Sequence, residues 1–377
     1  MMIATTIDQT DTALSPSLVD KRGQLLLNLR GRTARIPDLR PIFEGWKGIH
    51  HHHISPYVGH LRKTVNERIQ SLNFSDSKQE LLEQADFGLF TALWWPEASF
   101  ERIQILAYLV IWIFTWDDEI DEPTGAYSES FSDAQTYRAQ TLHFVETCMG
   151  LSEISSDNNS LSCRQNGLVE SFGVIGSALR NCYDISQRRR FRDEIARFMD
   201  ASEAEQRGRL NGEVPTIEEY WAFRMGTIAA YIASAAGEYS MGAHLPQELM
   251  DSKAMRALWD ETNVITSITN DLLSLGKEIS LGCIDSIVPL TFASTNDLHE
   301  AVLLSVEALS ASKQRFDEAA VALLAETRET DGTYKEVLDF IEVQRSNCVG
   351  NLIWSLETQR YNVSRVDTKD QSLEFTL

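Results

Sequence analysis

Two polar stretches about 150 residues apart decide how this chain folds: Asp117-Asp118-Glu119-Ile120-Asp121 and Asn270-Asp271-Leu272-Leu273-Ser274-Leu275-Gly276-Lys277-Glu278. In the first, Asp117 and Asp121 are four residues apart, which places both carboxylates on one face of a helix. In the second, Asn270, Ser274 and Glu278 follow at four-residue intervals and stack along one helix face. Hard divalent cations such as Mg²⁺ prefer oxygen ligands of these kinds. The sequence therefore predicts two metal-binding helix faces.

Each stretch also has a plainer interpretation. An isolated Asp-Asp-x-x-Asp is more often a solvated helix end, and the second stretch alone fits an ordinary amphipathic helix equally well. The first, however, ends an apolar stripe that runs to Trp116, where unpaired carboxylates are costly because the helix C-terminus is already partly negative. Together the two faces favour several Mg²⁺ ions that grip a diphosphate. The chain contains no Asp-x-Asp-Asp, so cyclisation initiated by protonation from a central aspartate is not supported.

Helical periodicity dominates from about residue 57, and strand signals are almost absent. The pattern predicts helices at roughly 57–72, 77–93, 99–118, 129–149, 164–184, 187–207, 217–241, 253–278, 297–326 and 332–361. No repeat or flexible linker divides them. Because the two stretches must converge to work, we expect one all-α domain over 41–361. Residues 1–40 are then a partly disordered N-terminal extension, and 362–377 a C-terminal tail.

The composition limits the partners of the chain. Its 377 residues carry a formal net charge of −21, which argues against nucleic acid or an anionic membrane as a partner. The hydrophobic content of 43 % is enough for a large core. The five cysteines form no Cys-x-x-Cys motif. The polar start of the chain lacks a signal-peptide pattern, and no apolar run is long enough to span a membrane. These features favour a cytoplasmic protein. The sequence leaves monomer and homodimer open.

His50–His53 is a run of four histidines. Such a run can bind metal adventitiously, but an exposed segment near the N-terminus is the favoured interpretation. The sequence assigns it no role.

At the two acidic stretches the chain resembles class I terpene synthases, most closely fungal sesquiterpene cyclases. The resemblance covers roughly residues 40–361. Asp117-Asp118-x-x-Asp121 is similar to the family's aspartate-rich motif, and Ala85–Glu101 looks like the segment that leads into it. Asn270-Asp271-x-x-Ser274-x-x-x-Glu278 fits the family's second metal motif at every defined position.

Three further features agree with the resemblance. Arg360-Tyr361 is similar to the family's C-terminal Arg-Tyr pair, and Trp354 stands where the family often places a tryptophan of the cavity. Arg224, 46 residues before Asn270, looks like the arginine that senses the diphosphate near a helix break. These features are weak singly and gain weight in company with the metal motifs.

The resemblance implies a helical bundle around an apolar cavity, with three Mg²⁺ at its mouth and Mn²⁺ as a substitute. The metal ligands would be Asp117, Asp118, Asp121, Asn270, Ser274 and Glu278. The donors to the diphosphate would be Arg224, Lys277, Arg360 and Tyr361. The reaction would be that of a sesquiterpene synthase, which ionises farnesyl diphosphate, releases diphosphate and cyclises the carbocation to a hydrocarbon or alcohol.

Aromatic side chains would shield that cation through cation–π attraction. The candidates are Phe87, Phe90, Trp94, Phe114 and Trp354. Phe90 and Trp94 are one helical turn apart, and Phe114 lies about one turn before Asp117. Taken singly, each also fits an ordinary hydrophobic core.

Other functions remain open at this stage. The substrate could be geranyl or geranylgeranyl diphosphate. An isoprenyl chain-elongating enzyme shares the fold but would normally carry two aspartate-rich motifs, whereas the second motif here has the Asn/Ser/Glu pattern. A non-catalytic isoprenoid carrier is disfavoured because the metal motifs are intact.

Overall fold

The structure, a computed structural model, describes residues 21–50, 53–152, 166–327, 332–361, 363 and 370–377. The predicted all-α class is confirmed, since helices make up most of the described chain and its only strands are two four-residue segments. They are α1 Lys21–Leu29, α2 Val58–Ser71, α3 Asp76–Gln84, α4 Phe87–Trp94, α5 Phe100–Asp121, α6 Phe131–Cys148, α7 Gly167–Glu170, α8 Gly173–Cys182, α9 Ile185–Leu210, α10 Ile217–Thr227, α11 Ala230–Ala235, α12 Gly237–Met241, α13 Gln247–Met250, α14 Lys253–Leu281, α15 Ile287–Thr295, α16 Leu298–Ala325 and α17 Gly332–Glu357. A 3₁₀ turn, Arg40–Phe43, and two strands, β1 Thr33–Ile36 and β2 Leu373–Thr376, complete the set.

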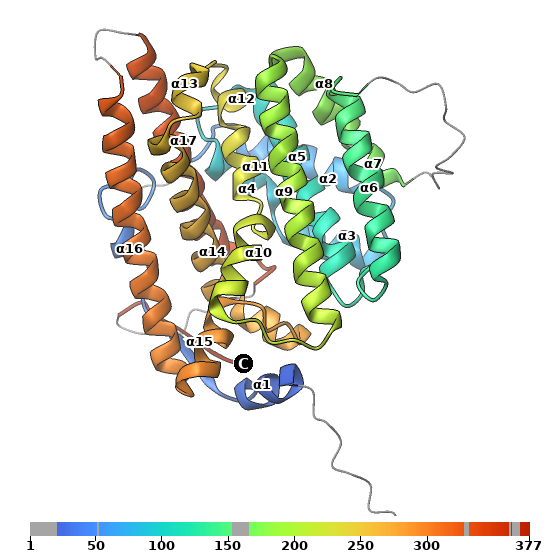
Figure 1. The fold of residues 1–377 in the computed structure, drawn as a ribbon, viewed down its shortest axis with the longest axis vertical. Helices are drawn as coiled ribbons and strands as arrows, with labels where there is room; N and C mark the ends of the chain where they lie inside the picture. The colour runs from blue at the N-terminus through green and yellow to red at the C-terminus, as the bar shows by residue number, and fades with distance from the viewer. Residues whose placement is uncertain (1–20, 51–52, 153–165, 328–331, 362, 364–369) are drawn as a thin grey trace, which may run out of the picture.

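The long helices run roughly along the vertical axis of Figure 1, with α16 and α17 at one side and α6 at the other. The α14 helix packs against both α16 and α17, and α17 packs against α4. On the other side α9 packs against α6 and α10. The α5 helix lies among these layers, with half of its residues buried and only Glu101 fully exposed. This packing places the ends of α5 and α17 beside the middle of α14.

Helix starts follow the capping chemistry of the sequence. Thr216 and Glu219 form a capping box at the start of α10, and Asp184 and Gln187 form another at the start of α9. Ser99 stands at the N-cap of α5 in an extended conformation, although its side chain makes no cap hydrogen bond.

Three predicted helices differ from the structure in ways that shape the site. The segment 77–93 divides at Asp86, which is left-handed at φ 52° and caps α4. The segment 217–241 divides into α10, α11 and α12, with Ala229 left-handed at φ 59°. The α17 helix ends at Glu357, so Arg360 and Tyr361 lie in a turn beyond it instead of on its last turn.

The two chain ends meet in a small antiparallel sheet, close to the C mark in Figure 1. Ile36 on β1 and Leu373 on β2 are register partners, and both are buried. Phe375 packs on α14, where a Cβ on Gly276 would lie 3.2 Å from the ring. Residues 21–40 and 370–377, expected as part of an extension and a tail, therefore pack against the bundle. The sequence gives no signal for either short strand.

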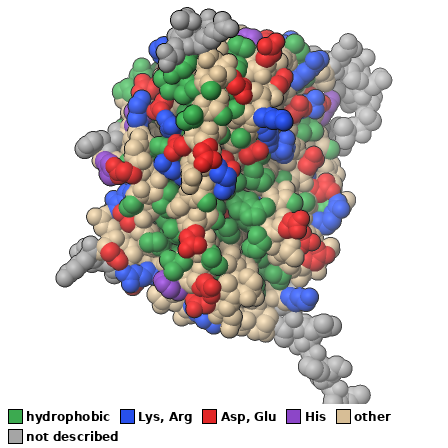
Figure 2. Space-filling view, turned by 60° about the vertical axis from the view of Figure 1, so that its left-hand side comes forward, with side chains coloured by type: hydrophobic (Ala, Val, Ile, Leu, Met, Phe, Trp, Pro, Cys, Tyr) green, Lys and Arg blue, Asp and Glu red, His purple; other side chains and the backbone are tan. Residues whose placement is uncertain are grey.

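The surface carries charges of both signs. On the face shown in Figure 2, lysines and arginines are interspersed with aspartates and glutamates around a hydrophobic area near the centre. Among the described helices, none is both long and apolar enough to cross a membrane. His50 pairs with Glu44 at 2.7 Å and His53 with Glu97 at 2.6 Å, while the middle of the histidine run lies outside the described residues.

Candidate active site

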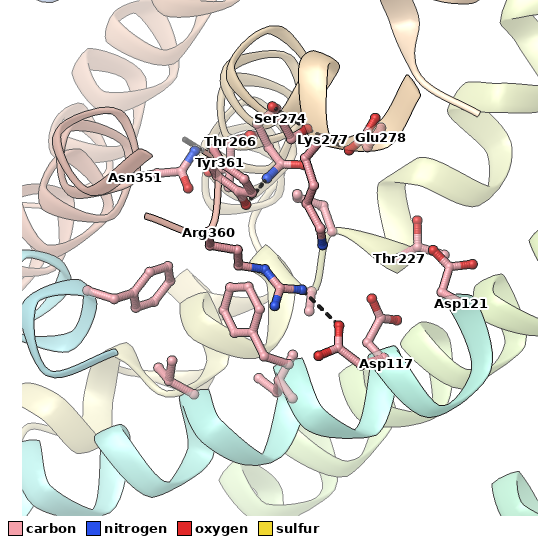
Figure 3. A pocket seen from close by; sticks show the side chains of 18 of the residues that line it. Asp117, Asp121, Thr227, Thr266, Ser274, Lys277, Glu278, Asn351, Arg360 and Tyr361 are labelled. Atoms are coloured by element: carbon pink, nitrogen blue, oxygen red, sulfur yellow. Dashed lines mark hydrogen bonds and ion pairs between the residues drawn. The ribbon is translucent and has the colours of Figure 1, made fainter. Parts of the chain in front are cut away.

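A cavity of about 180 Å³ lies where the ends of α5 and α17 meet the middle of α14 (Figure 3). All predicted metal ligands and diphosphate donors line it. These polar residues gather at one end: Asp117, Asp118, Asp121, Arg224, Asn270, Ser274, Lys277, Glu278, Arg360 and Tyr361. Most of the rest of the wall is aromatic or aliphatic. The structure thus brings both predicted motifs to one cavity, although they are 153 residues apart in the chain.

The α5 side of the cavity is a carboxylate face. Asp118 is 5 % exposed and accepts a hydrogen bond from Arg360 Nη2 at 2.8 Å. Asp117 and Asp121 face the cavity, and among the described residues neither carboxylate has a hydrogen-bond or ion-pair partner. Figure 3 shows both side chains reaching from the end of α5 toward the space below α14. The first face therefore presents two carboxyl groups that no described residue pairs with.

The electrostatics of this face follow from burial and from like charges. The pKa of Asp117 is raised well above its ordinary value by burial first, and then by the charges of Asp121 and Asp118. Burial also raises the pKa of Asp121. On α9, Glu205 faces the same cavity, and burial together with the charge of Asp121 raises its pKa well above the usual range. A cation would relieve all three carboxylates.

The α14 side of the cavity is instead hydrogen-bonded within itself. Ser274 Oγ donates to Glu278 Oε1 at 2.5 Å. Asn270 Oδ1 accepts from Arg224 Nη2 at 2.6 Å, and Asn270 Nδ2 donates to the Tyr361 hydroxyl at 2.7 Å. Burial is the largest cause that raises the pKa of Glu278 to about 7. The amide, hydroxyl and carboxylate oxygens of this face stack as the sequence spacing predicts.

Asp271, which follows the first ligand of the second motif, points away from the cavity. It is fully buried and accepts hydrogen bonds from Tyr220 Oη at 2.6 Å, Arg224 Nη2 at 2.6 Å and the Ile287 backbone N–H at 2.7 Å. It therefore holds Arg224 in place and ties α10 and α15 to α14. The sequence pattern assigns Asp271 no role of its own.

The basic donors converge from separate segments, and each contacts a carboxylate. Arg224 comes from α10 and pairs with Asp271, while Arg360 follows α17 and pairs with Asp118. Lys277, on α14, donates to Glu122 Oε1 at 2.9 Å. Neutralised in this way, the positive groups lie close together without repelling one another strongly.

The donor set fits a hard divalent cation. Within the described residues, no three acidic, histidine or cysteine side chains form a ready-made ligand group. The predicted set does not need one, because Asn270 and Ser274 supply an amide and a hydroxyl oxygen beside Glu278. The partnerless carboxylates of Asp117 and Asp121, with their raised pKa values, supply the negative charge that such an ion would neutralise.

Four of the five predicted aromatic residues line the cavity: Phe90, Trp94, Phe114 and Trp354. The guanidinium carbon of Arg360 lies 5.3 Å from the centroid of the Phe114 ring. Phe87 is different, because it is fully buried and is absent from the cavity wall. Its ring packs behind Phe114, 4.8 Å away between centroids.

Several wall residues were missed by the sequence analysis. Glu122 directly follows the first motif, so its position could have suggested it. Thr266 and Asn351 lie about one turn before Asn270 and Trp354, a spacing that could also have found them. Glu205 and Asp285 carry no local signal, since only the packing of α9 and of the α14–α15 turn brings them to the wall.

Comparisons with known proteins agree with this geometry. Residues 108–315 match the family model described as terpene synthase family 2, C-terminal metal binding. The chain is 33 % identical to the sesquiterpene cyclase hepA of Aspergillus oryzae over 92 % of this chain and 94 % of that protein. It is 26 % identical to a guaia-6,10(14)-diene synthase of Fusarium proliferatum over 83 % and 78 % of the two chains.

Solved structures share the fold at lower identity. The germacradien-4-ol synthase of Streptomyces citricolor superposes with a TM-score of 0.67 at 18 % identity, over 80 % of this chain and 94 % of the other. A crystal structure of an α-eudesmol synthase gives a TM-score of 0.68 at 18 % identity, over 80 % and 96 %.

Proposed function

The chain belongs to the terpene synthase family 2, and we propose that it is a Mg²⁺-dependent sesquiterpene synthase that ionises farnesyl diphosphate and cyclises the resulting carbocation. Terpene cyclase activity follows from the family and from the sesquiterpene cyclase relative. One observation carries the finer proposal: a cluster of carboxylates and basic donors closes one end of an otherwise largely apolar, aromatic cavity.

The carboxylate and amide faces would hold the metal. We propose Asp117 as the principal ligand on α5, assisted by Asp121, and Asn270, Ser274 and Glu278 as the ligands on α14. Asp118 is the weaker candidate, because its carboxylate already pairs with Arg360. When bound, three Mg²⁺ would supply Lewis-acid stabilisation of the departing diphosphate.

Arg224, Lys277, Arg360 and Tyr361 would bind the diphosphate through N–H and O–H donors. The breaking allylic C–O bond leaves concentrated negative charge on the diphosphate, and fixed donors stabilise this charge without reorganising. Their convergence also explains how a chain with a net charge of −21 binds an anionic substrate. Asp271 would act here as a positioning residue, since it fixes the guanidinium of Arg224.

The aromatic wall would shelter the cation that remains. Faces of Phe90, Trp94, Phe114 and Trp354 each attract a nearby cation by about 0.5–2 kcal/mol and carry no nucleophile that would end the reaction early. We propose that Phe87 acts only indirectly, by supporting the Phe114 ring from behind.

The test is separate incubation with the C10, C15 and C20 prenyl diphosphates and Mg²⁺. We expect diphosphate release and cyclic products to be greatest with the C15 substrate, and EDTA to abolish both. Turnover in a chelated assay would contradict the metal chemistry. A requirement for isopentenyl diphosphate would indicate a chain-elongating enzyme, and absence of diphosphate release from every substrate would indicate a carrier.

A further inference from the structure

Asn351, on α17, places an amide in the wall of the cavity outside the two metal motifs (Figure 3). The residue is only 3 % exposed. Trp354 follows about one helical turn later on the same helix and also lines the cavity. Because an amide beside an apolar wall loses its hydrogen bonds to water, both of its ends need other partners.

One end of this amide has its partner inside the protein. Asn351 Nδ2 donates to the Thr266 backbone oxygen on α14 at 3.3 Å. A backbone oxygen only accepts hydrogen bonds, so this contact fixes which end of the amide is the nitrogen. The oxygen, Oδ1, then points the other way, and Figure 3 shows it turned away from Thr266. No described residue donates a hydrogen bond to Oδ1.

Asn347, about one turn earlier on α17, shows what distinguishes this oxygen. Its Nδ2 likewise donates to a backbone oxygen, that of Trp94, at 2.8 Å. Its Oδ1, however, is sealed in the core without a partner among the described residues, and Asn347 is not part of the cavity wall. Asn351 Oδ1 is not sealed in this way. The oxygen of Asn351 is therefore open to the cavity.

The position of Asn351 places its oxygen away from the diphosphate end. Its partner Thr266 lies one helical turn before Asn270, about 6 Å along the axis of α14 from the first ligand of the second motif. Asn351 itself lies about 9 Å along α17 before that helix ends at Glu357, and the Arg360-Tyr361 pair follows later still. The amide oxygen thus adjoins the hydrocarbon part of a bound prenyl chain.

We propose that Asn351 is a specificity-determining residue, whose amide oxygen attracts the positive charge of the carbocation to the α14–α17 side of the cavity. The proposal rests on the cyclase function proposed above. A dipole that is already oriented stabilises charge where it develops, without reorganising. Cyclic cations whose charged carbon lies near this oxygen are favoured over isomers charged elsewhere. The amide therefore influences which product predominates.

The test compares the products of the wild type and of Asn351→Leu by GC–MS after incubation with farnesyl diphosphate and Mg²⁺. Leucine keeps the branched shape of asparagine and removes its dipole. We expect the ratio of the main product to its isomers to change about fivefold or more, which corresponds to about 1 kcal/mol. Asn351→Ala, which removes the amide without adding bulk, should change the same ratio in the same direction. If Asn351→Leu does not fold, Asn351→Ala decides.

The matched control is Asn347→Leu. It removes an equivalent hydrogen bond from an amide of the same helix to a backbone oxygen, here that of another wall residue, Trp94. We expect a lower thermal midpoint, because a buried hydrogen bond is lost, but the product ratios of the wild type. The control separates loss of the cavity-facing oxygen from a slight movement of the wall.

A second measurement separates charge from shape. A cyclic quaternary ammonium ion of the size of a cyclised farnesyl chain carries a fixed positive charge and has no N–H to donate. Isothermal titration calorimetry in the presence of Mg²⁺ and inorganic diphosphate gives its affinity. We expect binding to Asn351→Leu to be about fivefold weaker than binding to the wild type or to Asn347→Leu.

Three results would overturn the role of Asn351. They are product ratios unchanged in both Asn351→Leu and Asn351→Ala, equal changes of the ratios in Asn347→Leu and Asn351→Leu, and equal affinity of the wild type and Asn351→Leu for the ammonium ion. Absence of diphosphate release by the wild type from any prenyl diphosphate is a different result, because it would refute the cyclase function itself.

Discussion

The two metal-motif faces differ in how their polar groups are satisfied. On α5, Asp117 and Asp121 have no partner among the described residues, and their pKa values are raised. On α14, Asn270, Ser274 and Glu278 are linked by hydrogen bonds to one another or to the diphosphate donors. On the first face, the fold holds together carboxyl groups that repel one another when charged. On the second face, hydrogen bonds already fix the positions of the side chains.

This difference indicates that the two faces contribute to metal binding in different ways. A face of repelling carboxylates gains most from a cation and depends on it for its charge balance. A face whose oxygens are fixed by Arg224 and Tyr361 gains less, but it couples the metal to the diphosphate donors. Replacing a proposed metal ligand on α5 should therefore change the stability of the metal-free protein differently from replacing one on α14, even where both replacements abolish activity.

The largest effect is expected at Asp117. Asp117→Asn removes the charge but keeps the shape, and we expect diphosphate release to fall at least ~10²-fold because the metal that stabilises the leaving group binds poorly. Without metal, the thermal midpoint should rise, since one member of a repelling group is gone. The matched control is Glu101→Gln, an exposed carboxylate in the first turn of the same helix; it should leave diphosphate release unchanged and should not raise the midpoint, because a negative charge stabilises a helix N-terminus. A fall in the metal-free midpoint of Asp117→Asn would contradict the contrast between the faces.

Asn270→Ala tests the ordered face. Activity should fall about 10²-fold for the same reason. Stability should now fall as well, by about 1–3 kcal/mol, because the Tyr361 hydroxyl and the Arg224 guanidinium each lose a partner. Differential scanning calorimetry in EDTA measures the change. If Asn270→Ala and Asp117→Asn shifted the midpoint in the same direction, the two faces would not differ as described.

The pH dependence of stability should reveal the carboxylates directly. A carboxyl whose folded-state pKa is raised contributes stability that is fully present below its unfolded pKa and is lost as pH rises through the folded pKa. For Glu278 that window runs from its ordinary value of 4.5 to about 7. Asp117, Asp121 and Glu205 act in the same direction.

We therefore expect the thermal midpoint in EDTA to fall across this window. The additional stability given by Mg²⁺ should grow across the same window, reaching about 2.7 kcal/mol at about one hundred times its dissociation constant. Calorimetry at a series of pH values, with and without Mg²⁺, gives both curves. A Mg²⁺ effect independent of pH would mean that these carboxylates do not bind the ion.

The sequence predicted which residues of the two motifs share a helix face, because both motifs are local patterns. Four-residue spacing is enough to place Asn270, Ser274 and Glu278 on one face, and the capping box at Thr216 is equally local. The helix breaks were not predictable in this way. Ala229 lies in a run rich in good helix formers, yet it is left-handed in the structure, so tertiary packing overrides its propensity.

Contacts between distant segments were beyond the sequence for the same reason. Periodicity indicates that Asp271 faces the bundle, but not that Tyr220 and Arg224 meet it there. The pairing of β1 with β2 depends on where the chain ends leave the bundle, which four-residue strands cannot signal. Phe87 shows the same limit, since its spacing from Phe90 did not reveal that it lies behind the cavity wall.

The smallest effect is expected when an aromatic residue of the cavity wall is compared with one in the layer behind it. Phe114, about one turn before Asp117, lines the cavity, whereas Phe87 lies outside its wall and packs behind the rings of Phe114 and Trp354. Phe114→Leu removes an aromatic face worth about 0.5–2 kcal/mol to a passing cation, so ratios between products should change by about two- to tenfold. Phe87→Leu removes a similar ring from the core and should lower the thermal midpoint, with little change in the product ratios. GC–MS and calorimetry on both variants give the comparison. Equal changes in product ratios would mean that Phe87 shapes the cavity as strongly as the residues that line it, so that Phe87 would belong to the cavity wall and not to the core behind it.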